Sequence, residues 1–348
     1  MTAFATLPEA ERALIVNEAA ARLDVVPVIV EKDFWVCWAL GRLYRTPAVA
    51  PHTVFKGGTS LSKVFGAIRR FSEDIDLAVL PASLGVSEQA LNDAPSASQR
   101  RKRMQALTLA CEACVAERFQ PALEAVFRDA LGAPAAGGAW LHYELDSSAA
   151  TPNLLFTYPS ALPQPGGYVA KQVKLEFGAL TNQQPTGAHR IEAMLASVPG
   201  ASLAAAFDDL QADVTALALE RSFWEKATIL HAEYHRPPTL PIRDRFARHY
   251  ADFAALWQHA ARDAALRRPD LLADVVQHKS RYFGSAWASY ESAQPGSFRL
   301  VPPAPRQAAL AQDYAKMLPM FMTEPPAFDA VLAQLAAAEQ TLNGAARR

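Results

Sequence analysis

The sequence predicts an α+β fold, in which a small mixed β-sheet is followed by a mainly helical C-terminal lobe. Short runs of β-like composition gather in the first part of the chain, and a long helical stretch ending near Ala130 separates the second run from the third. From about Ser222 onward the spacing of apolar residues is helical. The β-like runs cover residues 53–55, 74–80, 140–146, 153–159 and 171–180. This grouping predicts two domains, at residues 1–200 and 201–348.

The composition narrows the class of protein. With 348 residues, 51% hydrophobic and 20% charged, the chain is long enough for two domains with real cores, and a net charge of -1 argues against a generic nucleic-acid coat protein. No apolar run approaches a membrane span, and the N-terminal stretch carries Glu9, Glu11 and Glu18 without the order of a signal peptide. We therefore expect a cytoplasmic protein with no membrane partner. Cys111 and Cys114 form a CxxC, but it lies in a helical stretch without a second pair, which disfavours a zinc site.

A Gly-Gly turn follows the first β-like run and precedes a segment of helical spacing. Gly57 and Gly58 let the backbone approach a polyphosphate closely, and N–H groups at the start of the next helix favour an anion. Thr59 and Ser60 add hydroxyl donors at the same end. The stretch lacks the Lys-Ser/Thr ending of a Walker A loop and the third glycine of a dinucleotide fingerprint. We expect these four residues to bind the phosphates of a nucleotide.

Two aspartates stand in the second β-like run. Asp74 and Asp76 alternate with Ile75 and Leu77, so a strand directs both carboxylates to one face and the aliphatic side chains to the other. Two carboxylates at this separation repel unless a cation lies between them. Mg²⁺ (or Mn²⁺) suits the position, because it is held by one or two carboxylates together with substrate phosphates.

The order of these motifs resembles a known group of enzymes. A Gly-Gly turn, a helix and an Asp-x-Asp strand, with fifteen residues between Gly58 and Asp74, are similar to the motif of the polymerase-β nucleotidyltransferase superfamily. The segments KGGTSLSKVF and RRFSEDIDL resemble more narrowly the AbiEii/AbiGii toxin family of type IV toxin–antitoxin and phage-defence systems. The resemblance implies a polymerase-β-like nucleotidyltransferase core within residues 1–200, and a helical domain at 201–348 that closes the cleft.

The resemblance also implies a third carboxylate on a neighbouring strand. The segment KQVKLEFG alternates polar and apolar residues, and Glu176 is the candidate within it, either as a third metal ligand beside Asp74 and Asp76 or as the base that accepts a proton from the attacking hydroxyl. An alternative stays open, in which Lys174 and Glu176 pair only with charges on neighbouring strands.

Two segments of the C-terminal half resemble further blocks of the family. The segment SFWEK implies that Lys226 contacts the nucleotide phosphates, and RDRFARHYADFAALW implies that Asp252 is a site residue, with Arg248 and His249 as weaker candidates. Ser222 and Glu225 have the spacing of a capping box, which predicts a helix beginning at Ser222.

Arg70 and the charged triplet at residues 31–33 each have two possible roles. Arg70 matches the family pattern Arg-x-Ser-x-Asp-x-Asp and either binds a phosphate in bidentate fashion or braces the aspartate strand through an ion pair. The triplet Glu31, Lys32 and Asp33 matches a family segment, although a charged first turn on a core helix explains it nearly as well.

The activity implied by the resemblance is metal-dependent transfer of a nucleotidyl group from an NTP, with GTP preferred in part of the family. The implied acceptor is RNA, in particular tRNA ends, and the implied partner is a cognate antitoxin. The basic run at residues 100–103 weakly favours RNA. Two alternatives remain: a protein-modifying nucleotidyl- or phosphotransferase, and an inactive member that binds nucleotide.

Overall fold

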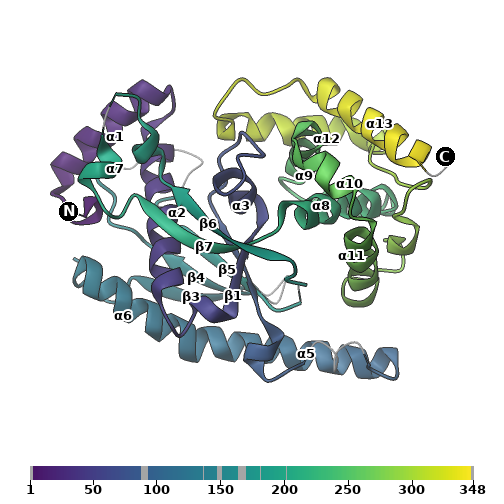
Figure 1. The fold of residues 1–348 in the computed structure, drawn as a ribbon, viewed down its shortest axis with the longest axis horizontal. Helices are drawn as coiled ribbons and strands as arrows, with labels where there is room; N and C mark the ends of the chain where they lie inside the picture. The colour runs from purple at the N-terminus through teal and green to yellow at the C-terminus, as the bar shows by residue number, and fades with distance from the viewer. Residues whose placement is uncertain are drawn as a thin grey trace. The chain divides into compact units, whose positions relative to one another are not determined.

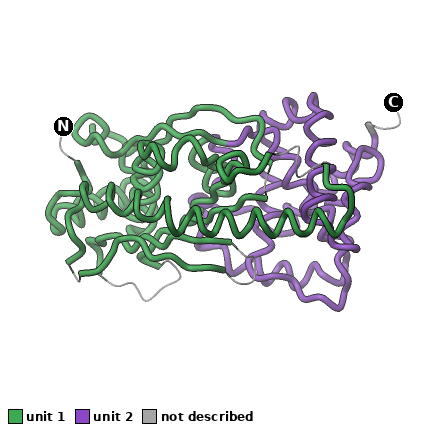
Figure 2. Tube along the Cα trace, turned by 90° about the horizontal axis from the view of Figure 1, so that it is seen from below, with its two compact units in different colours: residues 1–64, 72–216 green, residues 65–71, 217–348 purple. Residues whose placement is uncertain are grey.

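The computed structural model describes residues 3–87, 93–135, 137–146, 151–163, 170–180, 182–200 and 202–345 (Figure 1). The chain forms two compact units (Figure 2). The first contains residues 1–64 and 72–216, and the second contains residues 65–71 and 217–348. The short segment 65–71, which connects the Gly-Gly helix to the aspartate strand, therefore belongs to the second unit.

The first unit is built on a seven-stranded mixed sheet with the strand order β3-β4-β5-β2-β1-β7-β6. Strand β2 pairs in antiparallel fashion with β1 and in parallel fashion with β5, and β4 is antiparallel to β5 and β3. The strands are β1 Thr53–Lys56, β2 Ile75–Val79, β3 Leu141–Asp146, β4 Thr151–Phe156, β5 Val173–Gly178, β6 Thr186–Glu192 and β7 Gln211–Leu217. The predicted α+β class is confirmed, and the first five strands match the predicted runs to within three residues at each end.

Helices of the first unit cover the sheet and supply the aromatic part of its core. They are α1 Glu9–Leu23, α2 Pro27–Arg45, α3 Gly57–Lys63, α5 Ala97–Cys114, α6 Gln120–Leu131 and α7 Leu203–Ala206. Trp38 of α2 contacts Phe127 of α6 and Phe156 of β4, with ring centroids 4.9 and 5.7 Å apart. Helices α5 and α6 run on through a π-helical turn at Val115–Phe119, so the predicted long helix to about Ala130 is confirmed (Figure 1).

The second unit consists of helices joined by proline-containing loops. They are α8 Leu219–Tyr234, α9 Ala247–Gln258, α10 Ala261–Leu266, α11 Pro269–Tyr282, α12 Ala304–Met317 and α13 Phe328–Ala345. The helical prediction for this part of the chain is therefore confirmed. Within the described residues, no helix combines the length and the apolar character that a membrane span requires.

The predicted start of α8 at Ser222 is wrong. The helix begins at Leu219, and the backbone N–H of Ser222 already donates to the carbonyl of Ala218 inside the first turn. Glu225 is contacted by Arg221, with the guanidinium Nε 3.3 Å from the carboxylate, instead of closing a capping box. Residues 219–221 already form the first turn of α8, so the capping pattern falls within the helix.

Candidate active site

The Gly-Gly turn lies directly against the aspartate strand. Helix α3 begins at Gly57, immediately after β1, and Gly57 has a φ of +79°. A Cβ atom added to Gly57 would lie 1.8 Å from Oδ2 of Asp76. The backbone at Gly57 and the carboxylate of Asp76 therefore approach each other so closely that only a glycine fits, because real Cβ contacts are never this short.

The hydroxyl groups next to the turn are buried. Thr59 donates to the carbonyl oxygens of Ser72, at 3.2 Å, and of Asp74, so it holds the segment that leads into β2. Ser60 is also fully buried, and its Oγ has no hydrogen-bond partner. The phosphate-binding role of Gly57, Gly58, Thr59 and Ser60 stays a prediction.

Two of the three predicted carboxylates lie on neighbouring strands, and the third, Asp74, directly precedes the first of these strands. Asp76 is in register with Glu176 across the parallel pair β2 and β5, and Asp74 precedes Asp76 by two residues. Because side chains alternate along a strand and residues in register share a side of the sheet, Asp74, Asp76 and Glu176 belong to one face. The opposite face carries the fully buried Ile75 and Leu77. The pattern that predicts this arrangement is the alternation itself.

Lys174 is a cation on the same face. Its Nζ forms an ion pair with Oε2 of Glu176, and about a third of each side chain is exposed. Burial lowers the pKa of Lys174, but the hydrogen bond to Glu176 and the charges of Asp74 and Asp76 outweigh burial and raise it. Burial raises the pKa of Asp74 to about 6, with the neighbouring carboxylates acting in the same direction and Lys174 opposing them.

The donors on this face suit a hydrated magnesium ion. Carboxylate oxygens are the ligands that Mg²⁺ prefers, and the ion keeps several waters. Asn153 of β4, opposite Glu176, is 3% exposed, and its Oδ1 has no hydrogen-bond partner. A buried acceptor of this kind suits the water that Mg²⁺ retains. Among the described residues, no group of three or more His, Cys, Asp or Glu side chains is gathered closely enough to hold a metal ion.

The triplet Glu31, Lys32 and Asp33 is buried in the second turn of α2, so its reading as a charged first turn is wrong. Lys32 Nζ lies 2.7 Å from Oε2 of Glu73, which directly precedes Asp74. Asp33 Oδ1 lies 2.7 Å from Nζ of Lys63, in the last turn of α3. Helix α2 thus holds both the helix after the Gly-Gly turn and the residue before the first aspartate.

Lys63 and Glu73 were missed as supports of the site. Burial lowers the pKa of Lys63, but the adjacent Asp33 carboxylate outweighs burial and raises it, so Lys63 stays charged. The heptapeptide GGTSLSK ends in this lysine, and a single charge at the end of an otherwise uncharged helical segment is the available sequence signal.

The remaining predicted site residues form a second polar cluster, within the second unit. Arg70 binds Asp252 in bidentate fashion, with Nε to Oδ1 at 2.7 Å and Nη2 to Oδ2 at 2.9 Å. Lys226 Nζ donates to the same Oδ2 at 2.7 Å and lies 3.1 Å from Nδ1 of His249. Burial raises the pKa of Asp252, but the charges of Arg70 and Lys226 outweigh it and hold that pKa far below its usual range. Asp252 therefore remains an anion between two cations.

Burial also lowers the pKa of the two groups beside this anion. The pKa of Lys226 is lowered by burial, although the charge of Asp252 opposes this effect. The pKa of His249 is lowered well below its usual value by burial, and the charge of Lys226 acts in the same direction. A neutral His249 accepts a hydrogen bond from the ammonium of Lys226 through Nδ1. Of the two readings of Arg70, the structure supports an ion pair, which its guanidinium forms with Asp252.

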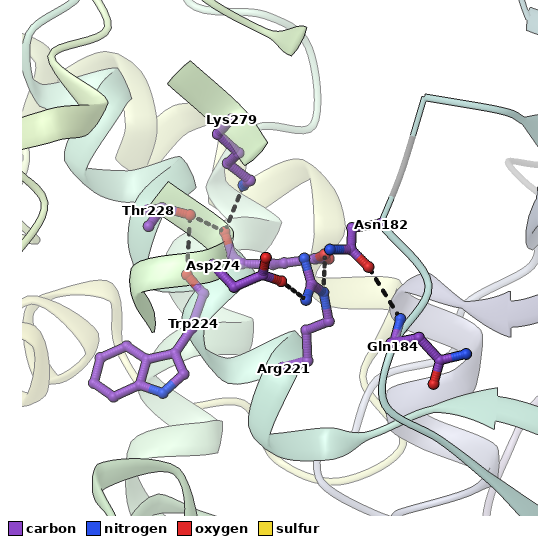
Figure 3. A network of polar contacts seen from close by, with 8 residues as sticks. Asn182, Gln184, Arg221, Trp224, Thr228, Asp274 and Lys279 are labelled. Atoms are coloured by element: carbon purple, nitrogen blue, oxygen red, sulfur yellow. Dashed lines mark hydrogen bonds and ion pairs between the residues drawn. The ribbon is translucent and has the colours of Figure 1, made fainter. Parts of the chain in front are cut away.

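Helix α8, which carries Lys226, is tied to α11 by polar contacts (Figure 3). Arg221 is almost fully buried, and its Nη1 lies 2.6 Å from Oδ2 of Asp274. Lys279 Nζ donates to the carbonyl of Glu225 at 2.9 Å. These two contacts join α8 to α11, whereas the hydroxyl of Thr228 donates to the carbonyl of Trp224 within α8 itself, at 2.9 Å.

A glycine turn packed against an Asp-x-Asp strand, in a mixed sheet with a third carboxylate in register, is the arrangement of a nucleotidyltransferase. Residues 38–334 match the family described as nucleotidyl transferase AbiEii toxin of the type IV toxin–antitoxin systems. Because the match covers most of the sequence, the chain belongs to the AbiEii nucleotidyltransferase toxin family, as the motifs predicted.

A solved structure supports the same fold. The chain is similar to MenT4, a nucleotidyltransferase toxin from Mycobacterium tuberculosis H37Rv, with a TM-score of 0.51 and 17% sequence identity. The similarity covers 97% of this chain and 89% of MenT4. At this identity it concerns the fold alone. No curated protein matches the sequence.

Proposed function

We propose that the protein is a Mg²⁺-dependent toxin that transfers a nucleoside monophosphate from an NTP to an RNA acceptor, in particular tRNA. The observation that carries the proposal is the contact of the Gly57 backbone with Asp76, which lies in register with Glu176. In the proposed site Asp74, Asp76 and Glu176 hold the metal, and Gly57 and Gly58 bind the phosphates. The metal, when bound, neutralises charge on the polyphosphate and polarises the α-phosphate.

The residues of the chain have separate roles in the proposed reaction. The acceptor hydroxyl attacks the α-phosphorus, the bond from that phosphorus to the bridging oxygen breaks, and pyrophosphate leaves. Once it is released from Lys174, Glu176 is proposed either to complete the metal site or to act as the base for the hydroxyl proton. Thr59 and Ser60 are proposed to bind the phosphates together with the Gly-Gly turn, and Lys226, which Asp252 holds beside Arg70, is proposed to offset phosphate charge.

RNA is the preferred acceptor because basic residues open helix α5. Arg101 and Lys102 are exposed in its first turns, and Ser96 caps the helix by accepting from the N–H of Gln99. Exposed arginine and lysine side chains on one helix end suit a phosphate backbone. The family membership supports a cognate antitoxin as partner. GTP as the substrate, a part in phage defence and a cytoplasmic location belong to the same proposal.

The test is transfer of label from each α-³²P-labelled NTP to total cellular RNA in the presence of Mg²⁺, followed by chelation with EDTA. We expect label in RNA with the wild type, none with Asp74→Ala/Asp76→Ala, and recovery of the wild type when Mg²⁺ is restored. Label in protein instead of RNA would show that the acceptor is a protein, contrary to the proposal. The same experiment with γ-³²P label separates nucleotidyl from phosphoryl transfer, because only the latter moves the γ-phosphate.

A further inference from the structure

We infer that Lys174 is an exchangeable counter-ion of the metal site: its ammonium group holds the carboxylates before the metal arrives, and then turns to the nucleotide phosphates. The inference rests on the proposed function, since it takes Asp74, Asp76 and Glu176 as the metal-binding face. It adds a role for a residue that the motif alone does not assign.

The position of Lys174 supports this role. Lys174 and Glu176 are two residues apart on β5, so they share the face on which Asp76 and Glu176 are in register. The ion pair between Lys174 and Glu176 binds one of the predicted metal ligands directly. Lys174 also lies close enough to Asp74 and Asp76 for their charges to act on it. One ammonium group thus neutralises part of the charge that a divalent ion would neutralise.

The surroundings of the other nearby lysines differ. Lys32 is buried and Lys63 nearly so, with side chains 3% and 13% exposed, and each is fixed by a buried or nearly buried carboxylate. The Lys174 side chain is 32% exposed. A flexible four-carbon stem with an exposed head can move at low cost, whereas a buried lysine leaves its carboxylate unpaired if it moves. Of these three lysines, Lys174 is therefore the one suited to exchange partners.

The chemistry of the exchange follows from charge balance. A divalent ion at the carboxylates repels the ammonium group, and the metal brings with it a polyphosphate that attracts the same group. Lys174 then gives up Glu176 and takes phosphate oxygens as its new partners. Glu176 becomes available to bind the metal or accept a proton only after this exchange.

The exchange predicts that one substitution changes the affinity for the metal and the affinity for the nucleotide in opposite directions. Lys174→Met should bind Mn²⁺ alone more tightly than the wild type, roughly fivefold, because the competing cation is absent. The same variant should bind a nucleotide more weakly in the presence of Mn²⁺, by a similar factor. Free Mn²⁺ is measured by electron paramagnetic resonance. The nucleotide is tested as the α,β-methylene analogues of the four common NTPs, whose α–β bridge cannot be broken at oxygen.

Controls separate this inference from general effects. Lys174→Arg keeps the charge and should bind Mn²⁺ as the wild type does, and Lys316→Met makes the same charge change on an exposed position of α12 and should change neither affinity. Thermal melts establish that each variant is folded, and Lys174→Gln replaces Lys174→Met if the latter does not fold.

Two results overturn the inference in different ways. If Lys174→Met binds Mn²⁺ no more tightly than the wild type, while Asp74→Ala/Asp76→Ala abolishes binding, the metal site stands and Lys174 is not its counter-ion. If Asp74→Ala/Asp76→Ala binds Mn²⁺ as the wild type does, the proposed metal site itself is wrong and the inference fails with it.

Discussion

Replacement of Gly57 by alanine tests the geometry at the centre of the site. The added Cβ would lie 1.8 Å from Oδ2, 2.5 Å from Cγ and 2.8 Å from Cβ of Asp76. All three atoms belong to one short side chain on a central strand, so the carboxylate cannot rotate away from the contact without leaving its position. A normal contact requires a shift on the order of 1 Å or more.

The magnitude combines this clash with backbone strain. Gly57 has a φ of +79°, a region that costs an L-residue about 1–2 kcal/mol. A catalytic group displaced by about 1 Å loses on the order of 10²-fold in rate. We therefore expect Gly57→Ala to lower the free energy of unfolding by about 2–4 kcal/mol and nucleotidyl transfer by about a hundredfold per folded molecule.

Gly85→Ala is the matched control. Gly85 has a φ of +74°, and a Cβ added there meets nothing within 4 Å, so this variant carries the strain without the clash. It should lose about 1–2 kcal/mol of stability and keep its rate. Urea denaturation gives the stability, and incorporation of α-³²P label gives the rate. Equal rates for wild type and Gly57→Ala, or equal losses in the two variants, would refute the reasoning.

Three further substitutions probe buried ionisable side chains. Asp33→Asn leaves the ammonium of Lys63 buried without its partner and should lower the free energy of unfolding by about 3–5 kcal/mol in urea; a loss below about 1 kcal/mol would contradict a buried ion pair. Asp252→Asn leaves Arg70 and Lys226 facing a neutral amide and should cost a similar amount, whereas an unchanged midpoint would show that the two cations find other partners. Burial, aided by the charge of His235, lowers the pKa of His231 to about 4, below its ordinary value of 6.5. The unfolded chain binds the extra proton between these values, so stability from neutral His231 is complete above about pH 6.5 and is lost as the pH falls toward 4. His231→Gln should reduce the fall in unfolding free energy between pH 7 and pH 4 by up to about 3 kcal/mol, and an unchanged pH dependence would disprove this.

Alternation along the strands made much of the sheet predictable, and the two strands that were not predicted either lack a clear alternation or run into an apolar segment that hides it. Strands β2 and β5 bury one face completely, so their sequences alternate clearly. Strand β6 lies at the edge of the sheet, and only Ile191 of its seven residues is buried, so it has too few apolar residues to reveal a pattern. Strand β7 alternates at Ala212, Val214 and Ala216 but runs into the apolar start of α8, which hides its end.

The active-site face was predictable for a related reason, whereas its supports were not. Asp76 lies on β2 and Asp74 directly precedes it, and the alternation around Glu176 identifies the face of that residue. What the sequence does not show is that β2 pairs with β5. The ion pair of Arg70 with Asp252 joins residues 182 positions apart, and no local pattern encodes such a contact. Charged residues in a sequence are usually exposed, so burial of Lys63 and Lys226 follows only from the folded chain.

The charged triplet of α2 connects these buried supports to the chemistry. Successive helical residues point in different directions, so three neighbouring charges reach three different segments. Glu31 accepts from the hydroxyl of Ser160 and the N–H of Ala161, beyond the two ion pairs made by Lys32 and Asp33. Buried ion pairs add little to stability compared with apolar packing, but breaking one is costly. Their effect here is therefore on geometry. A shift of α3, or of the segment before β2, relative to α2 would separate a buried charge from its partner and leave it in an apolar core. The ion pairs therefore hold the Gly57 turn and the aspartate strand at one fixed spacing. The close approach of Gly57 to Asp76, which leaves no room for a Cβ atom, requires such a spacing.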